Sequence, residues 1–236
     1  MKAKIKKFIY IHTTCLKEWE DVYKDVVSFI PDSEKENIVS VVLGDPKNNT
    51  VINPIIMRNF GMDYDEVITL QTMWNHARYL QKEEAHFYYL HLKGNTRQGE
   101  VRKCCDSWRR VMCHFMFKDI ELNEKLLTKY DCLGSMLQNN PLHYQGNFFV
   151  TKTSHLNRLP YIKYHSENRY HETWVTCIEG KYVCLTNPNT RLTNLYGINA
   201  SIEDYNTTNP WYIEQVKHPH GTTHTPITQL IGDKDK

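Results

Sequence analysis

One apolar stretch near the middle of the chain constrains the fold more than any other feature. Residues 87–92, Phe-Tyr-Tyr-Leu-His-Leu, form an almost continuous run of aromatic and aliphatic side chains, and Lys93, Gly94 and Asn95 follow directly. Such a run, ending in a polar loop, is typical of a strand that is buried on both faces of a parallel sheet. The stretch therefore predicts the central strand of an α/β fold.

The loop after this strand is the first candidate for a ligand site. Open α/β sheets bind ligands beyond the carboxyl ends of their strands. Side chains alternate along a strand, so His91 and Lys93 share one face near its end. In the functional interpretation, Lys93, together with His91 and Arg97, meets an anionic ligand such as the diphosphate of a nucleotide sugar. The alternative is a buried strand whose last lysine simply reaches solvent.

The segments before this strand complete a βαβ pattern. Residues 7–12 and 38–43 are short apolar strands, and residues 16–30 between them carry apolar side chains at helical spacing before Pro31. A second amphipathic helix over 70–80 leads into the central strand. Alternating strands and helices are typical of a parallel sheet. The prediction is therefore one α/β domain with a mostly parallel central sheet flanked by helices.

The second half of the chain reads as a series of shorter elements. The expected elements are a helix over 101–117, a strand over 130–137, a helix over 168–179 and a strand over 182–185. Residues 191–236 are rich in Asn, Thr and Pro, and they are expected to form a peripheral extension with a short helix near 210–217. The main domain is accordingly placed at residues 1–190.

Composition and charge limit the classes of partner and compartment. The net charge of +2 is too small to indicate a nucleic acid or a membrane surface as the partner. The seven cysteines include no Cys-x-x-Cys pair, which favours reduced thiols over a zinc site or a disulfide framework. The apolar run in residues 1–14 is too short for a signal peptide, and no segment resembles a transmembrane span. The expected location is the cytoplasm.

A basic helix leaves one alternative function open. Arg102, Lys103, Arg109 and Arg110 lie on the helix predicted over 101–117, where they could form a patch that binds nucleic acid. The other interpretation is an ordinary solvated helix face, which the small net charge favours. The chain also lacks the Walker loop, Gly-x-Gly-x-x-Gly, Gly-x-Ser-x-Gly and His-Glu-x-x-His motifs.

Two further segments carry candidate chemistry. Glu172 lies in the sequence His-Glu-Thr-Trp, and a carboxylate in a cleft can deprotonate a sugar hydroxyl as a general base. The alternative is an ordinary exposed glutamate on a helix. Gly146 and Asn147 interrupt an aromatic run, and a glycine in such a run often marks a bulge or the close approach of a ligand to the backbone.

Taken in order, several short segments resemble a family of compact glycosyltransferase-like proteins found in bacteria and large DNA viruses. They are YIHT at 10–13, YLHLKG at 89–94, DSWR at 106–109, YDCLG at 130–134, HYQGNFF at 143–149, LP at 159–160 and ETW at 172–174. The resemblance implies a GT-A-like, Rossmann-type fold with a nucleotide-sugar-binding catalytic domain over 1–190. It implies a hexosyl- or pentosyltransferase that inverts the anomeric centre and acts in the cytoplasm, which is that of the host if the protein is viral.

The resemblance also assigns roles to residues. It implies that His12 and Thr13, at the end of the first strand, contact the donor, with Asp45 as a further donor contact after the second strand. It implies that Gly146 and Asn147 border the sugar and the acceptor. The later carboxylate, Glu172, is the expected base. The expected partners are a nucleoside-diphosphate sugar, with a UDP-sugar favoured, and a glycan or glycoprotein acceptor, but no nucleic acid.

The chain departs from this family at the metal-binding motif. The family carries Asp-x-Asp at the end of the central strand, but this chain has His91-Leu92-Lys93 there, with no carboxylate between Glu84 and Glu100. Mg²⁺ prefers oxygen ligands, so no metal cofactor is expected, although Mn²⁺ or Mg²⁺ stays open. Our hypothesis is that Lys93, helped by Arg97 or His91, neutralises the leaving diphosphate. The alternative is a catalytically silent module that only binds a nucleotide or a glycan.

Overall fold

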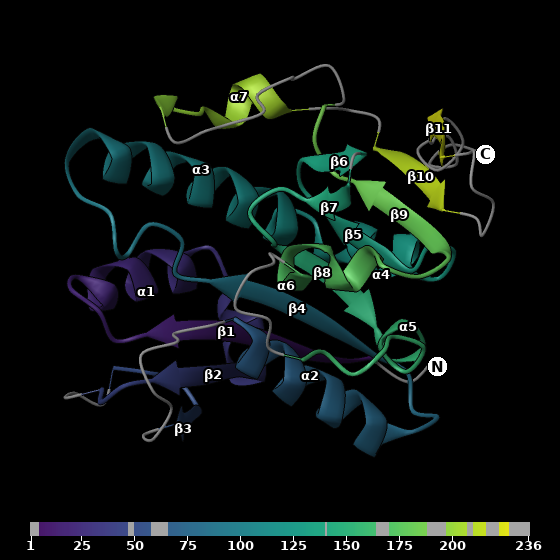
Figure 1. Ribbon diagram of the computed structural model, residues 1–236, viewed down its shortest axis with the longest axis horizontal. Helices are drawn as coiled ribbons and strands as arrows, with labels where there is room; N and C mark the ends of the chain where they lie inside the picture. The colour runs from purple at the N-terminus through teal and green to yellow at the C-terminus, as the bar shows by residue number, and fades with distance from the viewer. Residues whose placement is uncertain are drawn as a thin grey trace.

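A nine-stranded sheet runs through the part of the chain that the computed structural model describes, which is residues 5–46, 50–57, 66–139, 141–163, 170–187, 197–206, 210–215 and 222–226 (Figure 1). The strand order is β11-β10-β9-β5-β8-β4-β1-β2-β3. The strands are β1 (Lys6–Thr14), β2 (Ile38–Leu43), β3 (Pro54–Met57), β4 (Ala85–His91), β5 (Cys132–Gly134), β8 (Phe149–Lys152), β9 (Gly180–Cys184), β10 (Trp211–Gln215) and β11 (Thr222–Pro226).

Most strands of this sheet point in one direction. β3, β2, β1 and β4 pair in parallel, and so do β5 and β9. β8 runs antiparallel to both β4 and β5, and β10 runs antiparallel to both β9 and β11. The other seven strands therefore share one direction. A second, two-stranded sheet consists of β6 (Leu137–Asn139) and β7 (Leu142–Tyr144).

Helices cover both faces of the sheet, which confirms the predicted α/β class and its mostly parallel central sheet. The helices are α1 (Trp19–Ser28), α2 (Val67–Leu80), α3 (Gly99–Phe117), α4 (Ile120–Leu127), α5 (Thr153–Leu156), α6 (Tyr170–Thr173) and α7 (Ile202–Tyr205), with 3-10 turns η1 (Asp32–Asn37) and η2 (Trp174–Thr176). No helix of the described ranges is long and apolar enough to cross a bilayer.

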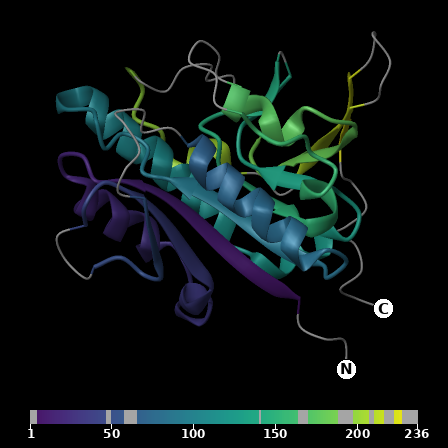
Figure 2. The same cartoon turned by 60° about the horizontal axis from the view of Figure 1, so that its bottom comes forward.

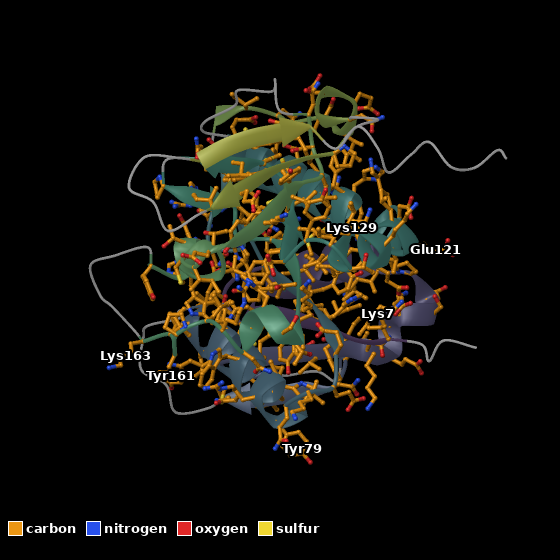
Figure 3. The ribbon with its side chains drawn as sticks, turned by 90° about the vertical axis from the view of Figure 1, so that its right-hand side faces the viewer. Lys7, Tyr79, Glu121, Lys129, Tyr161 and Lys163 are labelled. Carbon is orange, nitrogen blue, oxygen red and sulfur yellow. The ribbon has the colours of Figure 1, made fainter. Side chains whose placement is uncertain are left out.

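Side chains alternate along β1, so the strand contributes to two apolar cores, one on each face of the sheet. Ile9 and Ile11 are buried in one apolar cluster with residues of α1, α3 and α4. Tyr10, which lies between them, belongs to the opposite cluster with residues of α2. Figure 2 shows α2 lying along this second face, and the side chain of Tyr79 extends from its outer side into solvent (Figure 3). The strand is therefore buried from both sides, as its apolar sequence predicts.

The central strand has the position that its sequence predicts. β4 lies between β1 and β8, and residues 85–90 are buried. The register pairs His91 on β4 with His12 on β1. The carboxyl ends of both strands therefore reach the same edge of the sheet, and the loop that contains Lys93 follows there.

The later elements differ from the prediction in three places. The predicted strand over 130–137 is divided into β5 and β6, and the predicted helix over 168–179 is, in its described part, the short α6 followed by η2. The helix expected near 210–217 is wrong, because residues 211–215 form β10. Aromatic and β-branched side chains suit a strand, and pairing with β9 decides the outcome. The segment after residue 190 thus contributes β10 and β11 to the main sheet.

Candidate functional site

The candidate site lies where the strand order changes direction. From β1 the chain adds β2 and β3 on one side, and it then returns through α2 to place β4 on the other side. Ligands of open α/β sheets bind beyond the carboxyl ends of the strands at such a switch point. A cleft of about 230 Å³ lies at this edge. Its lining residues are His12, Thr14, Leu16, Glu66, His91, Leu92, Lys93, Gly94, Asn95, Thr96, Arg97 and Glu172.

The cleft brings together five residues that the sequence singles out. His12 and His91 come from the ends of β1 and β4, Lys93 and Arg97 come from the loop after β4, and Glu172 comes from α6. These positions are up to 160 residues apart in the sequence. The fold therefore places two cationic side chains and a carboxylate around one hollow.

Four other predicted residues lie outside the lining of this cleft. Thr13 is completely buried, and its neighbour Thr14 lines the cleft instead. Asp45 is exposed beyond the end of β2. Gly146 and Asn147 lie behind His91, where the carbonyl oxygen of Gly146 is 2.8 Å from His91 Nε2. The segment Gly146–Asn147 therefore supports the wall of the cleft in this structure.

Packing and backbone geometry fix the loop that carries Lys93. The Lys93 ammonium lies 4.1 Å from the centre of the Trp108 ring, which is a favourable position for a cation over an aromatic face. Gly94 has φ +90°, and a Cβ atom there would lie 2.5 Å from the Cβ of Cys105. Only glycine fits this turn, because the left-handed conformation and the close helix α3 both exclude a side chain.

The basic helix is a solvated face only in part, because Lys103 and Arg110 are exposed but Arg109 is buried. Arg109 on α3 is only 2% exposed, and its guanidinium donates to the carbonyl oxygen of Lys93 at 2.7 Å. It also donates to Asp106 and to Asp25 on α1, each at 2.7 Å. Its neighbour Arg110 is exposed and donates to the same Asp25. Arg109 is thus a structural cation that holds the Lys93 loop, so both sequence interpretations are wrong for this residue.

A carboxylate that the sequence interpretation missed lines the cleft. Glu66, the residue before α2, accepts hydrogen bonds at Oε2 from the Tyr89 hydroxyl at 2.9 Å and from Asn147 Nδ2 at 2.8 Å. Its Oε1 lies 3.5 Å from Nδ1 of His91. The only local signal was an acidic residue at the start of an amphipathic helix, which commonly caps the helix dipole.

Charge in the cleft keeps Glu66 ionised. Burial alone would raise the pKa of the Glu66 carboxyl, but attraction to the charged forms of His91, His171 and His12, which matter at acidic pH, and the hydrogen bond from the Asn147 amide lower it to about 2. A general base works best when its pKa lies near the operating pH. Glu66 is therefore suited to be a fixed acceptor of hydrogen bonds, and it is a poor candidate for the base.

The wall behind His91 stores backbone strain. Asn147 has φ +57°, and Gly146 before it has φ +84°. A non-glycine residue in the left-handed region costs free energy, and such residues concentrate at functional sites. The strained turn presents the Gly146 carbonyl to His91 and the Asn147 amide to Glu66. Both contacts orient side chains that line the cleft.

Glu172 reaches the cleft from a short helix that is anchored by its neighbour. Trp174 is completely buried, and its indole nitrogen donates to the carbonyl oxygen of Pro160 at 2.9 Å. Thr176 donates to the carbonyl oxygen of Leu142. These contacts fix the segment that follows α6, while Glu172 itself is half-buried at the cleft.

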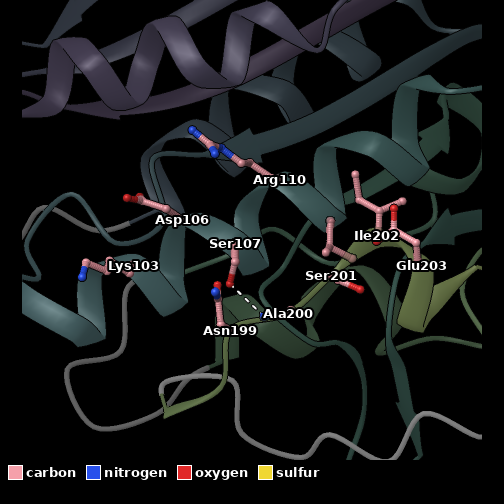
Figure 4. Close-up of a pocket in the computed structure, with 10 residues that line it drawn as sticks. Lys103, Asp106, Ser107, Arg110, Asn199, Ala200, Ser201, Ile202 and Glu203 are labelled. Atoms are coloured by element: carbon pink, nitrogen blue, oxygen red, sulfur yellow. Dashed lines mark hydrogen bonds between the residues drawn. The ribbon is translucent and has the colours of Figure 1, made fainter.

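A second cavity, of about 450 Å³, lies between α3 and residues 199–203 (Figure 4). Three charged side chains of its lining already form ion pairs: Lys103 with Glu100, Arg110 with Asp25, and Asp106 with Arg102 and Arg109. The backbone nitrogen of Ala200 donates to the hydroxyl of Ser107 across it. The cleft at the switch point is therefore the stronger candidate for a ligand site.

Among the residues that the structure describes, the cleft shows no ligand set of the usual Mg²⁺ kind. Within the described ranges, no group of three or more His, Cys, Asp and Glu side chains is arranged to hold a metal ion. The polar groups of the lining include the imidazole of His91, the ammonium of Lys93 and the carboxylates of Glu66 and Glu172. Hard cations prefer a shell of oxygen ligands, which this set does not supply.

Comparison with known proteins gives a family but no activity. A sequence family described as a domain of unknown function (DUF8361) matches residues 22–197. No curated protein and no solved structure matches the chain. The matched range contains Glu66, Lys93, Arg97, Arg109 and Glu172, and it covers about three quarters of the 236 residues. The chain therefore belongs to the DUF8361 family.

Proposed function

We propose that this protein is a GT-A-like glycosyltransferase that moves a sugar from a nucleoside-diphosphate sugar, with a UDP-sugar favoured, to a hydroxyl of a glycan or glycoprotein. The observation that carries the proposal is the cleft beyond β1 and β4, where Lys93 and Arg97 lie with the carboxylate of Glu172. The same cleft suits an anionic leaving group at one side and proton transfer at the other.

Each group has a role in the proposed reaction. Lys93 and Arg97 bind the diphosphate, and Glu172 takes the proton of the acceptor hydroxyl. The acceptor oxygen then bonds to the anomeric carbon, while the bond from that carbon to the diphosphate oxygen breaks and its electron pair stays on the diphosphate. A single displacement of this kind inverts the anomeric centre.

Lysine and arginine take the place of a metal ion in this proposal. Negative charge grows on the diphosphate as the glycosidic bond breaks, and fixed cations stabilise that charge. The contact of the Lys93 ammonium with Trp108 and the bond of the Lys93 carbonyl to Arg109 both support a fixed position. The reaction is therefore expected to proceed without a divalent cation.

A thermal-shift screen tests the donor site. The protein is heated with UDP-, GDP-, CMP- and dTDP-sugars, each with EDTA and with Mn²⁺. A ligand at 100 times its Kd stabilises the folded state by about 2.7 kcal/mol, which raises the Tm by several degrees. We expect one nucleotide class to raise the Tm equally in EDTA and in Mn²⁺. No shift with any nucleotide sugar would contradict the proposal.

Lys93→Ala and the control variant Lys103→Ala are compared in this screen and in an assay of sugar transfer. The variant should lose the shift and most of the transfer, whereas Lys103→Ala, which removes an exposed lysine of α3, should keep both. Activity that disappears in EDTA and returns with Mn²⁺ would disprove the metal-free role of Lys93. Binding without transfer or hydrolysis would indicate a silent binding module instead.

A further inference from the structure

Two hydrogen-bond acceptors face each other at the cleft. Oε1 of Glu66 and Nδ1 of His91 are 3.5 Å apart, and both side chains remain partly accessible, at 17% and 12% exposure. The distance is longer than a hydrogen bond between these atoms. The hydrogen bonds that the two side chains make with the wall of the cleft determine the roles of Oε1 and Nδ1.

The bonds of Glu66 leave Oε1 for a ligand. Tyr89 and Asn147 both donate to Oε2, so this oxygen is fixed against the wall. A carboxylate has several lone-pair directions and can accept further bonds. Oε1 is therefore the oxygen that meets a donor from the cleft.

The bond of His91 to the wall determines its tautomer. Nε2 lies 2.8 Å from the carbonyl oxygen of Gly146, and a carbonyl oxygen only accepts, so Nε2 carries the hydrogen. In the neutral ring Nδ1 is then an acceptor. Burial lowers the pKa of His91, although Glu66 opposes this effect, and so favours the neutral ring at neutral pH.

We propose that Glu66 Oε1 and His91 Nδ1 together bind a vicinal diol of the ligand, one hydroxyl donating to each acceptor. Two adjacent hydroxyls on a sugar ring present two donors at a comparable separation, and two acceptors side by side repel each other until such donors arrive. This inference rests on the proposed function and deepens it. The diol belongs either to the ribose of the nucleotide or to the transferred sugar.

Glu66→Gln is a sharp test because the wall dictates how the new amide is oriented. Tyr89 and Asn147 both donate to the position of Oε2, so the amide oxygen takes that position as long as the Asn147 side chain keeps its orientation. The amide NH₂ group then replaces Oε1 and faces His91 Nδ1. The variant should keep its Tm, while the diol meets a donor where it needs an acceptor. Glu121→Gln, on the outer side of α4, is the control.

The experiment measures Kd by calorimetry for UDP, 2′-deoxy-UDP, UDP-glucose and UDP-3-deoxyglucose. If the diol is that of ribose, the wild type should bind 2′-deoxy-UDP about tenfold or more weakly than UDP, as for loss of a bond to a charged group. If it is that of the sugar, UDP-3-deoxyglucose should be the weaker ligand by a similar factor. Glu66→Gln should abolish this preference, and Glu121→Gln should retain it.

Three results would overturn the inference. The first is that the wild type binds 2′-deoxy-UDP as tightly as UDP and UDP-3-deoxyglucose as tightly as UDP-glucose. This result needs only the wild type, so it is decisive even if Glu66→Gln does not fold. The second is a preference that Glu66→Gln leaves unchanged. The third result concerns the case in which no nucleotide binds, so that the proposed function is already disproved. Methyl β-ribofuranoside and methyl α-glucopyranoside are then tested by saturation-transfer NMR: binding that Glu66→Gln removes supports the diol site, and no binding overturns it.

Discussion

Glu172 is the side chain that takes the proton in the proposed chemistry. A general base contributes about 10²–10⁴-fold to the rate of a reaction. Glu172→Gln keeps the size of the side chain but cannot accept a proton at neutral pH. Transfer should therefore fall at least about 100-fold, while the Kd for the nucleotide sugar stays close to that of the wild type. A parallel loss of rate and affinity would make the role of Glu172 structural.

Gly94 is a residue whose replacement tests the shape of the Lys93 loop. Gly94→Ala combines φ +90° with a Cβ contact of 2.5 Å to Cys105, and we expect it to lower the free energy of unfolding by about 2–4 kcal/mol. Gly99→Ala is the matched control, because its φ is +60° but no atom lies within 4 Å of the added Cβ. It should cost only about 1 kcal/mol. Urea unfolding of both variants measures the difference, and equal losses would contradict the close contact.

At the scale of secondary-structure elements, α3 contains two neighbouring arginines with very different surroundings. Arg109 is 2% exposed and has bonds to Asp25, Asp106 and the Lys93 carbonyl, whereas Arg110 shares only Asp25 and is 57% exposed at its side chain. Removing Arg109 takes one donor from the Lys93 carbonyl and leaves Asp25 and Asp106 with the cations Arg110 and Arg102 alone. Loss of one partner from a buried ion pair costs about 3–5 kcal/mol, but an exposed pair contributes at most about 1 kcal/mol.

Arg109→Met should therefore destabilise the protein by about 3 kcal/mol, and Arg110→Met by less than about 1 kcal/mol. The measurement is the free energy of unfolding in urea at neutral pH. Nucleotide affinity should also fall in Arg109→Met, since the Lys93 loop loses its bond to α3. Equal effects of the two substitutions would show that Arg109 is not the structural cation.

The elements also show where sequence interpretation succeeds. The apolar run over 87–92 identifies β4, because burial on both faces leaves a local pattern. The sequence interpretation did not predict strand β10, because three apolar residues in a row fit a helix as well as a strand. Only the pairing with β9 decides between the two. Lys93 and Glu172 could be singled out because each is a charged residue at or beside an element that the sequence predicts. Glu66 was missed because its donors Tyr89 and Asn147 are 23 and 81 residues away, and no local pattern encodes such contacts.

At the scale of the whole molecule, the segment after residue 190 contributes to the core and to the edge of the sheet. Ala200 and Tyr205 are buried in the cluster with α1 and α3, and Ile213 is buried in the opposite one. β10 covers the edge of β9. An uncovered strand edge invites pairing between molecules.

A chain ending at residue 190 tests this contribution. Loss of these buried side chains should remove about 4 kcal/mol of stability, and it should lower the Tm by roughly 10 °C. Light scattering should rise because the edge of β9 is open. The full chain is the control in both measurements. An unchanged Tm and an unchanged scattering signal would mean that the segment is peripheral, as its composition suggests.

The bond between Arg109 and the Lys93 carbonyl has an evolutionary consequence. Arg109 bonds to the backbone carbonyl of residue 93, so this bond does not depend on which side chain that position carries in related proteins. Replacing Arg109, in contrast, removes the bond that holds the loop, while Asp25 keeps its bond to Arg110. Mutation can thus alter the charge that the cleft offers to a ligand while the inherited frame stays intact. A single position of this fold can therefore change the ligands that the cleft accepts while the rest of the chain stays the same.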